Sequence, residues 1–172
     1  MSEDSTGPLV RVGITGHISL TEYSTQLVYD ALVAALSSFS GHTLRGVTCL
    51  AEGADQIFAD AVLAARGTLE VILPSRDYRD RAIRPANVAR FDDLLGRAAT
   101  VSYACSEASG DVAYAAAGAE LLRRCDHLLA VWDGAREGRC GGTAEVVAMA
   151  ERSGIPVTRV WPQGSRREPP PS

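Results

Sequence analysis

The chain has 172 residues, of which 46% are hydrophobic and 22% are charged, as is ordinary for a globular protein with one sizeable core. Its net charge is -4 and its isoelectric point is about 5.4, which argues against a general nucleic-acid binder, so we expect no nucleic-acid partner. No apolar run approaches the roughly 20 residues of a membrane span, and residues 1–8 lack the apolar stretch of a secretory signal. We therefore expect a cytoplasmic protein without a membrane partner.

The basic residues and the cysteines narrow the chemistry further. All 17 basic residues are arginine, which excludes reactions that need a lysine amine. The cysteines lie far apart, without the spacing of metal ligands, so we interpret them as reduced thiols and expect no metal site and no cofactor. They are Cys49, Cys105, Cys125 and Cys140.

Apolar, β-branched runs alternate along the chain with amphipathic segments of helical period. Residues 1–8 and 163–172 carry no core-forming pattern and are expected to be disordered tails, and residues 75–86 are expected to be irregular. Ser19 and Glu22 have the spacing of a capping box at the start of the first helix. The predicted strands are 9–15, 43–49, 69–73, 100–104, 127–132 and 156–161, and the predicted helices are 19–39, 54–65, 87–98, 109–124 and 143–152.

This alternation predicts a single α/β domain over residues 9–162. Strands that alternate with helices form parallel βαβ units, so we expect a three-layer Rossmann-like sandwich with a mostly parallel sheet of about six strands and helices on both faces. Ligands of such folds bind beyond the carboxyl ends of the strands. The loops that follow the strands hold most of the polar and glycine residues, so the binding face is expected there.

The stretch from 128 to 147 has the clearest functional pattern. A strand leads through a glycine-rich turn into a helix that begins at Gly141, Gly142 and Thr143. Backbone N–H groups and the positive end of the helix dipole favour an anion such as phosphate at this position, and Glu145 follows in the first helical turn. The same residues are also compatible with a plain tight turn and with an acid that merely stabilises the helix.

Further candidates lie in the loops after the first, second and fifth strands. Each has a structural alternative, because glycine, aspartate and a lone histidine are common in turns and at helix starts. Their expected convergence on one edge of the sheet favours a binding role. The candidates are Gly16, His17, Glu52, Gly53, Asp55, Asp133 and Gly134.

Four segments resemble the SMF/DprA–LOG superfamily, usually called SLOG, over about residues 10–161. They are VGITGH at 12–17, LAEGADQIFA at 50–59, VILP at 71–74, and AVWDG with GGTAEVV within 130–147. The resemblance implies a Rossmann-like fold that binds nucleotides or their derivatives. LOG enzymes are phosphoribohydrolases, which cleave the N-glycosidic bond of nucleoside 5′-monophosphates, whereas other members are ligand sensors in bacterial nucleotide signalling.

The resemblance also implies roles for individual residues. Gly141 to Thr143 would cradle phosphate and Glu145 would meet the ribose, while Gly16 and His17 would line the floor and Gly53 would let the backbone approach the ligand. Two departures from LOG enzymes are visible. Thr143 directly follows Gly142, where the LOG signature has a further residue and glycine, and no basic residue lies between Arg97 and Arg123, where LOG enzymes carry an Arg-Lys pair.

A second resemblance, over residues 127–157, is to nucleoside deoxyribosyltransferases and related N-hydrolases. It implies that Glu145 attacks or stabilises the anomeric carbon while Glu52 assists the leaving base. The leading hypothesis is a nucleotide-binding SLOG domain, with a ligand sensor that performs no turnover as one possible form. The alternative is an N-glycosidase that acts on a nucleoside monophosphate. A single-stranded-DNA binder is disfavoured by the acidic composition. The alanine-rich segment 113–119 suggests packing against a second copy, so a homodimer is expected.

Overall fold

The computed structural model describes residues 7–105, 110–136 and 142–169 and contains one six-stranded sheet in the order β4-β3-β2-β1-β5-β6. Every neighbouring pair of strands is parallel, which confirms the predicted Rossmann-like α/β fold. The strands are β1 (Leu9–Gly16), β2 (Thr43–Thr48), β3 (Thr68–Leu73), β4 (Thr100–Tyr103), β5 (His127–Val131) and β6 (Val157–Arg159).

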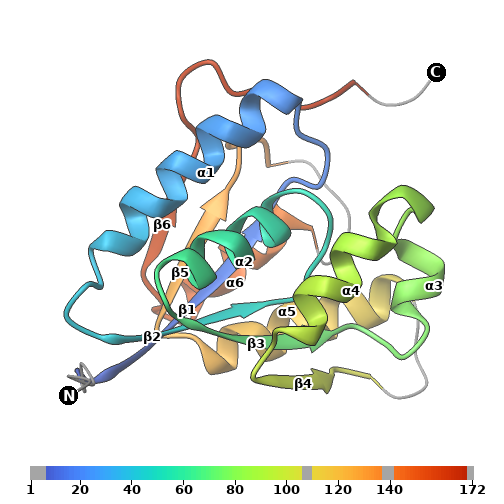
Figure 1. Cartoon of the computed structure of the whole chain (residues 1–172), viewed down its shortest axis with the longest axis horizontal. Helices are drawn as coiled ribbons and strands as arrows, with labels where there is room; N and C mark the ends of the chain where they lie inside the picture. Colours follow the sequence, from blue (N-terminus) through green and yellow to red (C-terminus); the bar gives the residue numbers. More distant parts are fainter. Residues whose placement is uncertain (1–6, 106–109, 137–141, 170–172) are drawn as a thin grey trace.

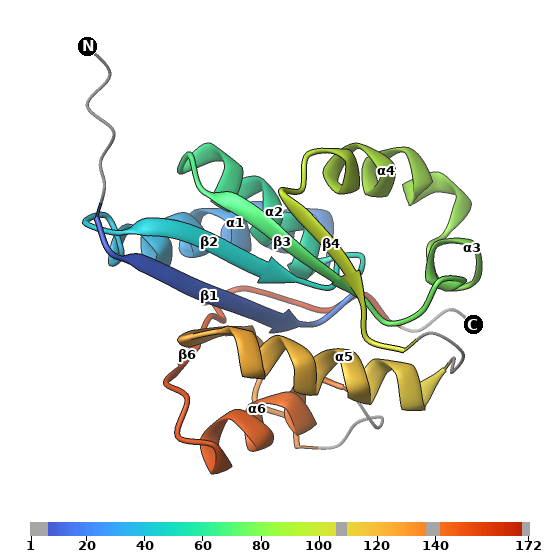
Figure 2. The same ribbon diagram turned by 90° about the horizontal axis from the view of Figure 1, so that it is seen from below.

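Helices cover both faces of the sheet and complete the three predicted layers. Figure 2 shows α1, α2 and α4 on one face and α5 and α6 on the other. The helices are α1 (Glu22–Ser37), α2 (Ala54–Ala64), α3 (Tyr78–Ala82), α4 (Val88–Gly96), α5 (Asp111–Arg124) and α6 (Thr143–Arg152), with a 3-10 turn η1 (Pro85–Asn87) before α4. Among the described residues, no helix combines the length and apolar character needed to cross a membrane.

The apolar core has two parts, one on each face of the sheet. The larger part lies under α1, α2 and α4 and contains fully buried Phe58, Leu32 and Phe91. The smaller part lies under α5 and α6, where Leu121 and Val146 pack against the sheet. Burial on both faces explains why the strands read as continuous apolar runs rather than alternating ones.

The alanine-rich face of α5 is used within the chain. Ala113 and Ala117 are buried, and a Cβ placed on Gly118 would lie 3.1 Å from Cγ2 of Val146 in α6. Small residues on this face therefore let α5 approach α6 and the sheet closely. The homodimer expected from this segment stays a prediction.

The segment from 75 to 87 contains more regular structure than the sequence suggests, namely α3 and η1. Tyr78, which is 4% exposed, anchors α3. Its ring lies 6.1 Å from that of Phe91 and 6.0 Å from that of Tyr114. A single buried tyrosine in an arginine-rich stretch has no periodicity, so sequence patterning could not reveal this helix.

The first helix begins at a different cap from the predicted one. The N-cap is Thr21, whose hydroxyl accepts a hydrogen bond from the backbone N–H of Ser24 at 3.2 Å. Ser19 does not cap the helix, because Leu20 next to it is held in an extended bridge with Arg167. The prediction that Ser19 caps this helix was therefore wrong, and the cap lies two residues later, at Thr21.

Thr21→Ala is expected to lower the free energy of unfolding by about 1 kcal/mol, since it removes the acceptor for an otherwise unsatisfied helix N–H. Urea unfolding monitored by circular dichroism measures this effect. Ser19→Ala is the matched control and is expected to change the free energy of unfolding by less than about 0.5 kcal/mol. A larger loss in Ser19→Ala than in Thr21→Ala would contradict this assignment of the cap.

After β6 the chain turns back to the start of α1, and we call residues 161–168 the strap (Figure 1). The backbone N–H of Glu168 donates to the carbonyl of Ser19 at 3.2 Å, and the N–H of Thr21 donates to the carbonyl of Arg166 at 3.2 Å. The N–H of Arg166 also donates to Oγ of Ser24 at 2.7 Å. These bonds fix the strap against the loop after β1, although its sequence carries no core-forming pattern.

Candidate functional site

The order of the strands reverses between β1 and β5, since β2, β3 and β4 lie on one side of β1 and β5 and β6 on the other. Open parallel sheets bind ligands in the crevice at such a switch point, beyond the carboxyl ends of the strands. Gly16 at the end of β1 pairs in register with Val131 at the end of β5. The loops that follow these two strands therefore leave the sheet side by side.

His17 and Asp133 meet at this switch point. The backbone N–H of Asp133 donates to Nε2 of His17 at 3.2 Å, and Oδ1 of Asp133 lies 3.2 Å from the same nitrogen. The ring of Trp161, from the strap, packs edge-on against the imidazole with 5.5 Å between ring centroids. Two predicted site residues, 116 positions apart, are thus brought into contact.

Electrostatics favour a neutral His17 beside an ionised Asp133. Burial, followed by the positive charge of Arg167, lowers the pKa of His17, although Asp133 opposes the shift. Burial alone would raise the pKa of Asp133, but the N–H of Ala135, His17 and Arg167 together lower it. Because Nε2 accepts the N–H of Asp133, a neutral imidazole carries its proton on Nδ1, and this donor suits it to an oxygen of a sugar hydroxyl.

Gly16 and Gly53 allow β1 and α2 to approach closely. A Cβ on Gly16 would lie 2.5 Å from Cβ of Ala54, and a Cβ on Gly53 would lie 2.6 Å from the carbonyl oxygens of both His17 and Ile18. Gly53 has φ of 81° and is the N-cap of α2, whose first N–H, from Ala54, donates to the carbonyl of His17 at 3.1 Å. Gly53 therefore lies directly against the backbone of His17, while Gly16 lets the end of β1 approach Ala54 and Val131.

Glu52 is bound by Arg84 through both of its oxygens. Oε1 accepts the backbone N–H of Arg84 at 2.8 Å, and Oε2 accepts Nε at 2.7 Å and lies 2.6 Å from Nη2. The Glu52 side chain is 11% exposed, whereas that of Arg84 is 75% exposed. This carboxylate connects the start of α2 to the segment before η1, and its ion pair with Arg84 competes with the predicted role of assisting a leaving base.

Asp55 lies inside the protein and is 6% exposed. Its Oδ2 accepts the backbone N–H of Ala51 at 3.2 Å. Burial raises the pKa of Asp55 to about 7, against the opposing hydrogen bonds from the N–H groups of Ala51 and Cys49. Its negative charge also adds to the effect of burial in raising the pKa of the Tyr78 hydroxyl. The structure therefore places Asp55, a predicted ligand-binding residue, beneath the surface, where the backbone of its own loop holds its carboxylate.

The start of α6 faces the same edge because it follows the end of β5. Gly142 is the N-cap, with φ of -76° and ψ of 173°, and its carbonyl accepts the N–H of Val146 at 3.1 Å. Thr143 and Glu145 in the first turn are half-buried. Gly141, the remaining residue of the predicted phosphate cradle, lies outside the described residues.

Arg159, Trp161 and Arg167 belong to this site although sequence reasoning did not select them. Nη2 of Arg159 donates to the carbonyl of Asp133 at 2.6 Å, and Nε donates to the carbonyl of Trp132 at 2.9 Å. The guanidinium of Arg159 also passes 3.1 Å from where a Cβ on Gly134 would lie, at φ of 91°. No local motif marks these residues. The pairing of β6 with β5 brings Arg159 to the switch point, and the return of the strap brings Trp161 and Arg167 there.

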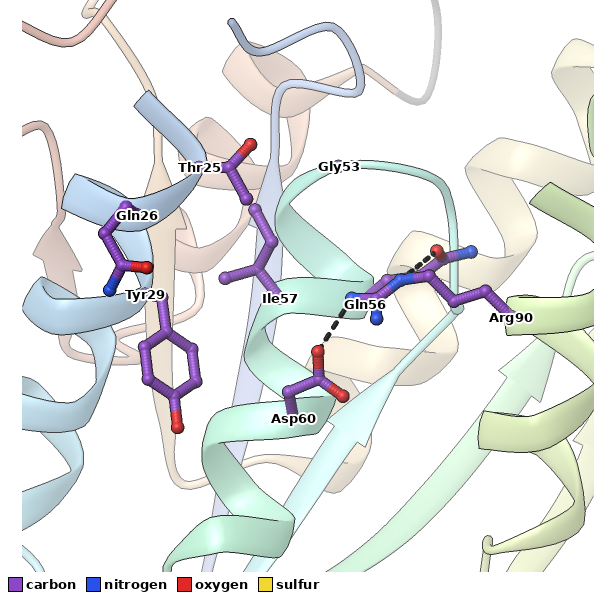
Figure 3. Close-up of a pocket in the computed structure, with 8 residues that line it drawn as sticks. All are labelled: Thr25, Gln26, Tyr29, Gly53, Gln56, Ile57, Asp60 and Arg90. Atoms are coloured by element: carbon purple, nitrogen blue, oxygen red, sulfur yellow. Dashed lines mark hydrogen bonds and ion pairs between the residues drawn. The ribbon is translucent and has the colours of Figure 1, made fainter. Parts of the chain in front are cut away.

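A pocket of about 480 Å³ opens between α1 and α2, next to α4 (Figure 3). Ile57 and Tyr29 give it an apolar wall, while Arg90 donates to Asp60 at 2.8 Å and to Gln56 at 3.1 Å. The pocket reaches Gly53 at the start of α2. Its lining residues are Thr25, Gln26, Tyr29, Gly53, Gln56, Ile57, Asp60 and Arg90. Among the described residues, neither this pocket nor any other place gathers three His, Cys, Asp or Glu side chains that could hold a metal ion.

The strand order, with all neighbouring strands parallel, defines a Rossmann-like α/β fold, which is the fold that the sequence resemblance implied, and several solved structures share it. The chain is similar to DNA processing protein A (DprA) from Streptococcus pneumoniae, with a TM-score of 0.61 and 18% identity over 88% of this chain and 50% of that one. It is also similar to DprA from Helicobacter pylori, with a TM-score of 0.60 and 20% identity over 87% of this chain and 64% of that one. A structural-genomics target, TM1055, matches with a TM-score of 0.56 and 17% identity over 86% of this chain and 72% of that one.

The match covers 50% of the length of the Streptococcus pneumoniae protein and 64% of the length of the Helicobacter pylori one, so this chain corresponds to only part of each. No protein-family model and no curated protein matches the chain. These comparisons establish the fold.

The comparisons also correct the expectation that the chain has no nucleic-acid partner. The Helicobacter pylori protein is described as having a single-stranded DNA binding mode, on the same fold. The expectation was drawn from net charge, which averages over the whole surface and carries no information about a local groove. It was therefore wrong to exclude nucleic acid on that ground.

Proposed function

We propose that this chain binds a nucleotide or nucleotide derivative at the switch point between β1 and β5. In this proposal the N–H groups of Gly142 and Thr143 hold a phosphate, and Glu145 meets the sugar. His17 contributes the Nδ1–H donor of its neutral imidazole to a sugar hydroxyl, since its Nε2 accepts from Asp133. Gly16, Gly53 and Gly134 keep the surrounding backbone close, and the backbone N–H of Asp133 orients His17.

The observation that carries the proposal is the contact between His17 and Asp133. It joins the loops after β1 and β5 at the position where parallel sheets bind ligands, beside the start of α6. The N–H groups in the first turn of a helix have no partner within the helix itself, so they are available to an anion. The geometry therefore supports a phosphorylated ligand better than a neutral one.

The first test replaces one N–H without disturbing the helix. Thr143 is the first residue of α6, where proline is well tolerated, and the extended backbone of Gly142 suits a residue before proline. Thr143→Pro is expected to weaken the affinity for nucleoside 5′-monophosphates by about tenfold or more, since a charge-assisted hydrogen bond is lost. Isothermal titration calorimetry with AMP, GMP, CMP and UMP measures this change.

Thr143→Ala is the matched control, since it keeps the N–H and removes the side chain. Adenosine, which lacks the phosphate, is expected to bind equally to wild type and Thr143→Pro. Binding of a thymidine oligonucleotide without binding of any mononucleotide would contradict the proposal. So would a wild-type protein that none of the four monophosphates binds.

The alternative function is hydrolysis of the N-glycosidic bond, with Glu145 as the catalytic carboxylate. Glu52, its predicted partner, is engaged by Arg84, which favours binding without turnover. Incubation with each monophosphate, followed by chromatography for released base, separates the two functions. Base release that is lost in Glu145→Gln, but kept in Glu151→Gln on the exposed end of the same helix, would replace the binding proposal by the enzymatic one.

A further inference from the structure

We propose that Arg167, carried by the strap, is a phosphate-binding residue of the switch-point site. This inference rests on the proposed function and assigns the cation that a phosphorylated ligand requires. The backbone of the strap, and not the guanidinium itself, holds Arg167 at this position.

The strap brings Arg167 to the switch point as part of a short antiparallel pairing. Leu20 and Arg167 form a bridge, and the flanking bonds join Ser19 to Glu168 and Thr21 to Arg166. Residues on both sides of Arg167 are thus fixed to the loop that follows β1. The side chain of Arg167 leaves this pairing toward Asp133, in the loop that follows β5.

The guanidinium of Arg167 has donors to spare. Nη1 lies 3.7 Å from Oδ2 of Asp133, which is an ion pair at a distance beyond a hydrogen bond. Within the ranges 7–105, 110–136 and 142–169, no hydrogen bond from this guanidinium is found, and the side chain is 52% exposed. An arginine carries five N–H groups in a planar fork that matches two phosphate oxygens.

Two other arginines at this edge are engaged by the protein. Arg84 is bound to Glu52, and Arg159 donates to the carbonyls of Trp132 and Asp133. A phosphate near Asp133 would meet an ionised carboxylate, so a cation is needed to offset that repulsion. Arg167 already pairs with this carboxylate and is the residue positioned to do so.

The test compares two neighbouring arginines of the strap. Arg167→Gln is expected to weaken the affinity for a nucleoside 5′-monophosphate by about tenfold or more, and to leave the affinity for the unphosphorylated nucleoside unchanged. Arg166→Gln removes the same charge from the adjacent position, where only the backbone makes described hydrogen bonds, and is expected to change the affinity by less than about twofold. Both are measured by isothermal titration calorimetry at two salt concentrations, and the wild type is expected to lose more affinity with salt than Arg167→Gln.

Asp133→Asn separates a ligand contact from a structural ion pair. If Arg167 binds phosphate, removing the competing carboxylate is expected to strengthen monophosphate binding several-fold; a purely structural pair predicts the same loss in Asp133→Asn as in Arg167→Gln. Equal affinities of wild type, Arg166→Gln and Arg167→Gln, together with weakened binding by Thr143→Pro, would overturn the role of Arg167 and leave the proposed function standing. A wild type that binds no monophosphate would overturn both.

Discussion

Between pH 4 and pH 8, the free energy of unfolding of the wild type is expected to fall by roughly 4 kcal/mol more than that of Asp55→Asn. Burial raises the pKa of Asp55 to about 7 in the folded chain, whereas its ordinary value is 3.8. The folded state therefore keeps a proton that the unfolded state releases. The stability that this proton confers is fully present below about pH 4 and is lost as the pH rises through 7.

Urea unfolding of both proteins at five pH values measures this difference. The comparison uses the change of the free energy of unfolding with pH. The loss of a hydrogen bond that asparagine fails to make lowers stability equally at every pH, so it does not affect this comparison. The comparison also cancels the contribution of His17, whose lowered pKa acts in the opposite sense, because the stability it confers is lost as the pH falls. Asp93→Asn, at an exposed position in α4, is the control, and it is expected to change the free energy of unfolding by less than about 0.5 kcal/mol. Parallel curves for Asp55→Asn would refute the assignment.

Gly53→Ala is expected to lower the free energy of unfolding by roughly 3 kcal/mol. The added Cβ would lie 2.6 Å from two backbone carbonyl oxygens, and the φ of 81° strains any residue other than glycine. Because those carbonyls belong to His17 and Ile18, relief of the overlap must shift the loop after β1. Thermal and urea unfolding measure the loss, and the mononucleotide titration is expected to show weaker binding in the same variant.

Gly96→Ala is the matched substitution in a site without such contacts. A Cβ there would meet no atom within 4 Å, and the residue lies at the end of α4. Alanine is expected to stabilise this helix by about 0.5–1 kcal/mol, since it restricts the unfolded chain more than glycine does. Similar losses in both variants would show that the contacts of Gly53 are not the cause.

Sequence patterning predicted the six strands and the helices α1, α2, α4, α5 and α6, because each of these segments has its own local periodicity. Apolar β-branched runs and helical stripes recur with their own periods, and parallel βαβ connection then fixes the layers. The loops after β1 and β5 were also predictable as neighbours, and His17 and Asp133 do lie together. These predictions needed only the local periodicity of each segment and the rule that the carboxyl ends of parallel strands lie at the same edge of the sheet.

The position of the strap and the burial of Asp55 could not be predicted from local sequence patterns. Arg167 reaches Asp133 through hydrogen bonds between residues far apart in sequence, and a polar, proline-containing stretch gives no sign of that return. Asp55 at the start of a helix resembles an ordinary acid favoured by the dipole, and its raised pKa follows from burial that the sequence does not show. The cap at Thr21 differs from the expected Ser19 for the same reason, since the strap extends the backbone before it.

The sheet has a feature at its margins that bears on self-association. Of the strands that the structure describes, the two outermost are the shortest, with four residues in β4 and three in β6. A neighbouring molecule approaching either margin finds only a brief row of backbone donors and acceptors to pair with. Growth of the sheet from one molecule into the next, the route by which many β-containing proteins form fibres, is thereby restricted.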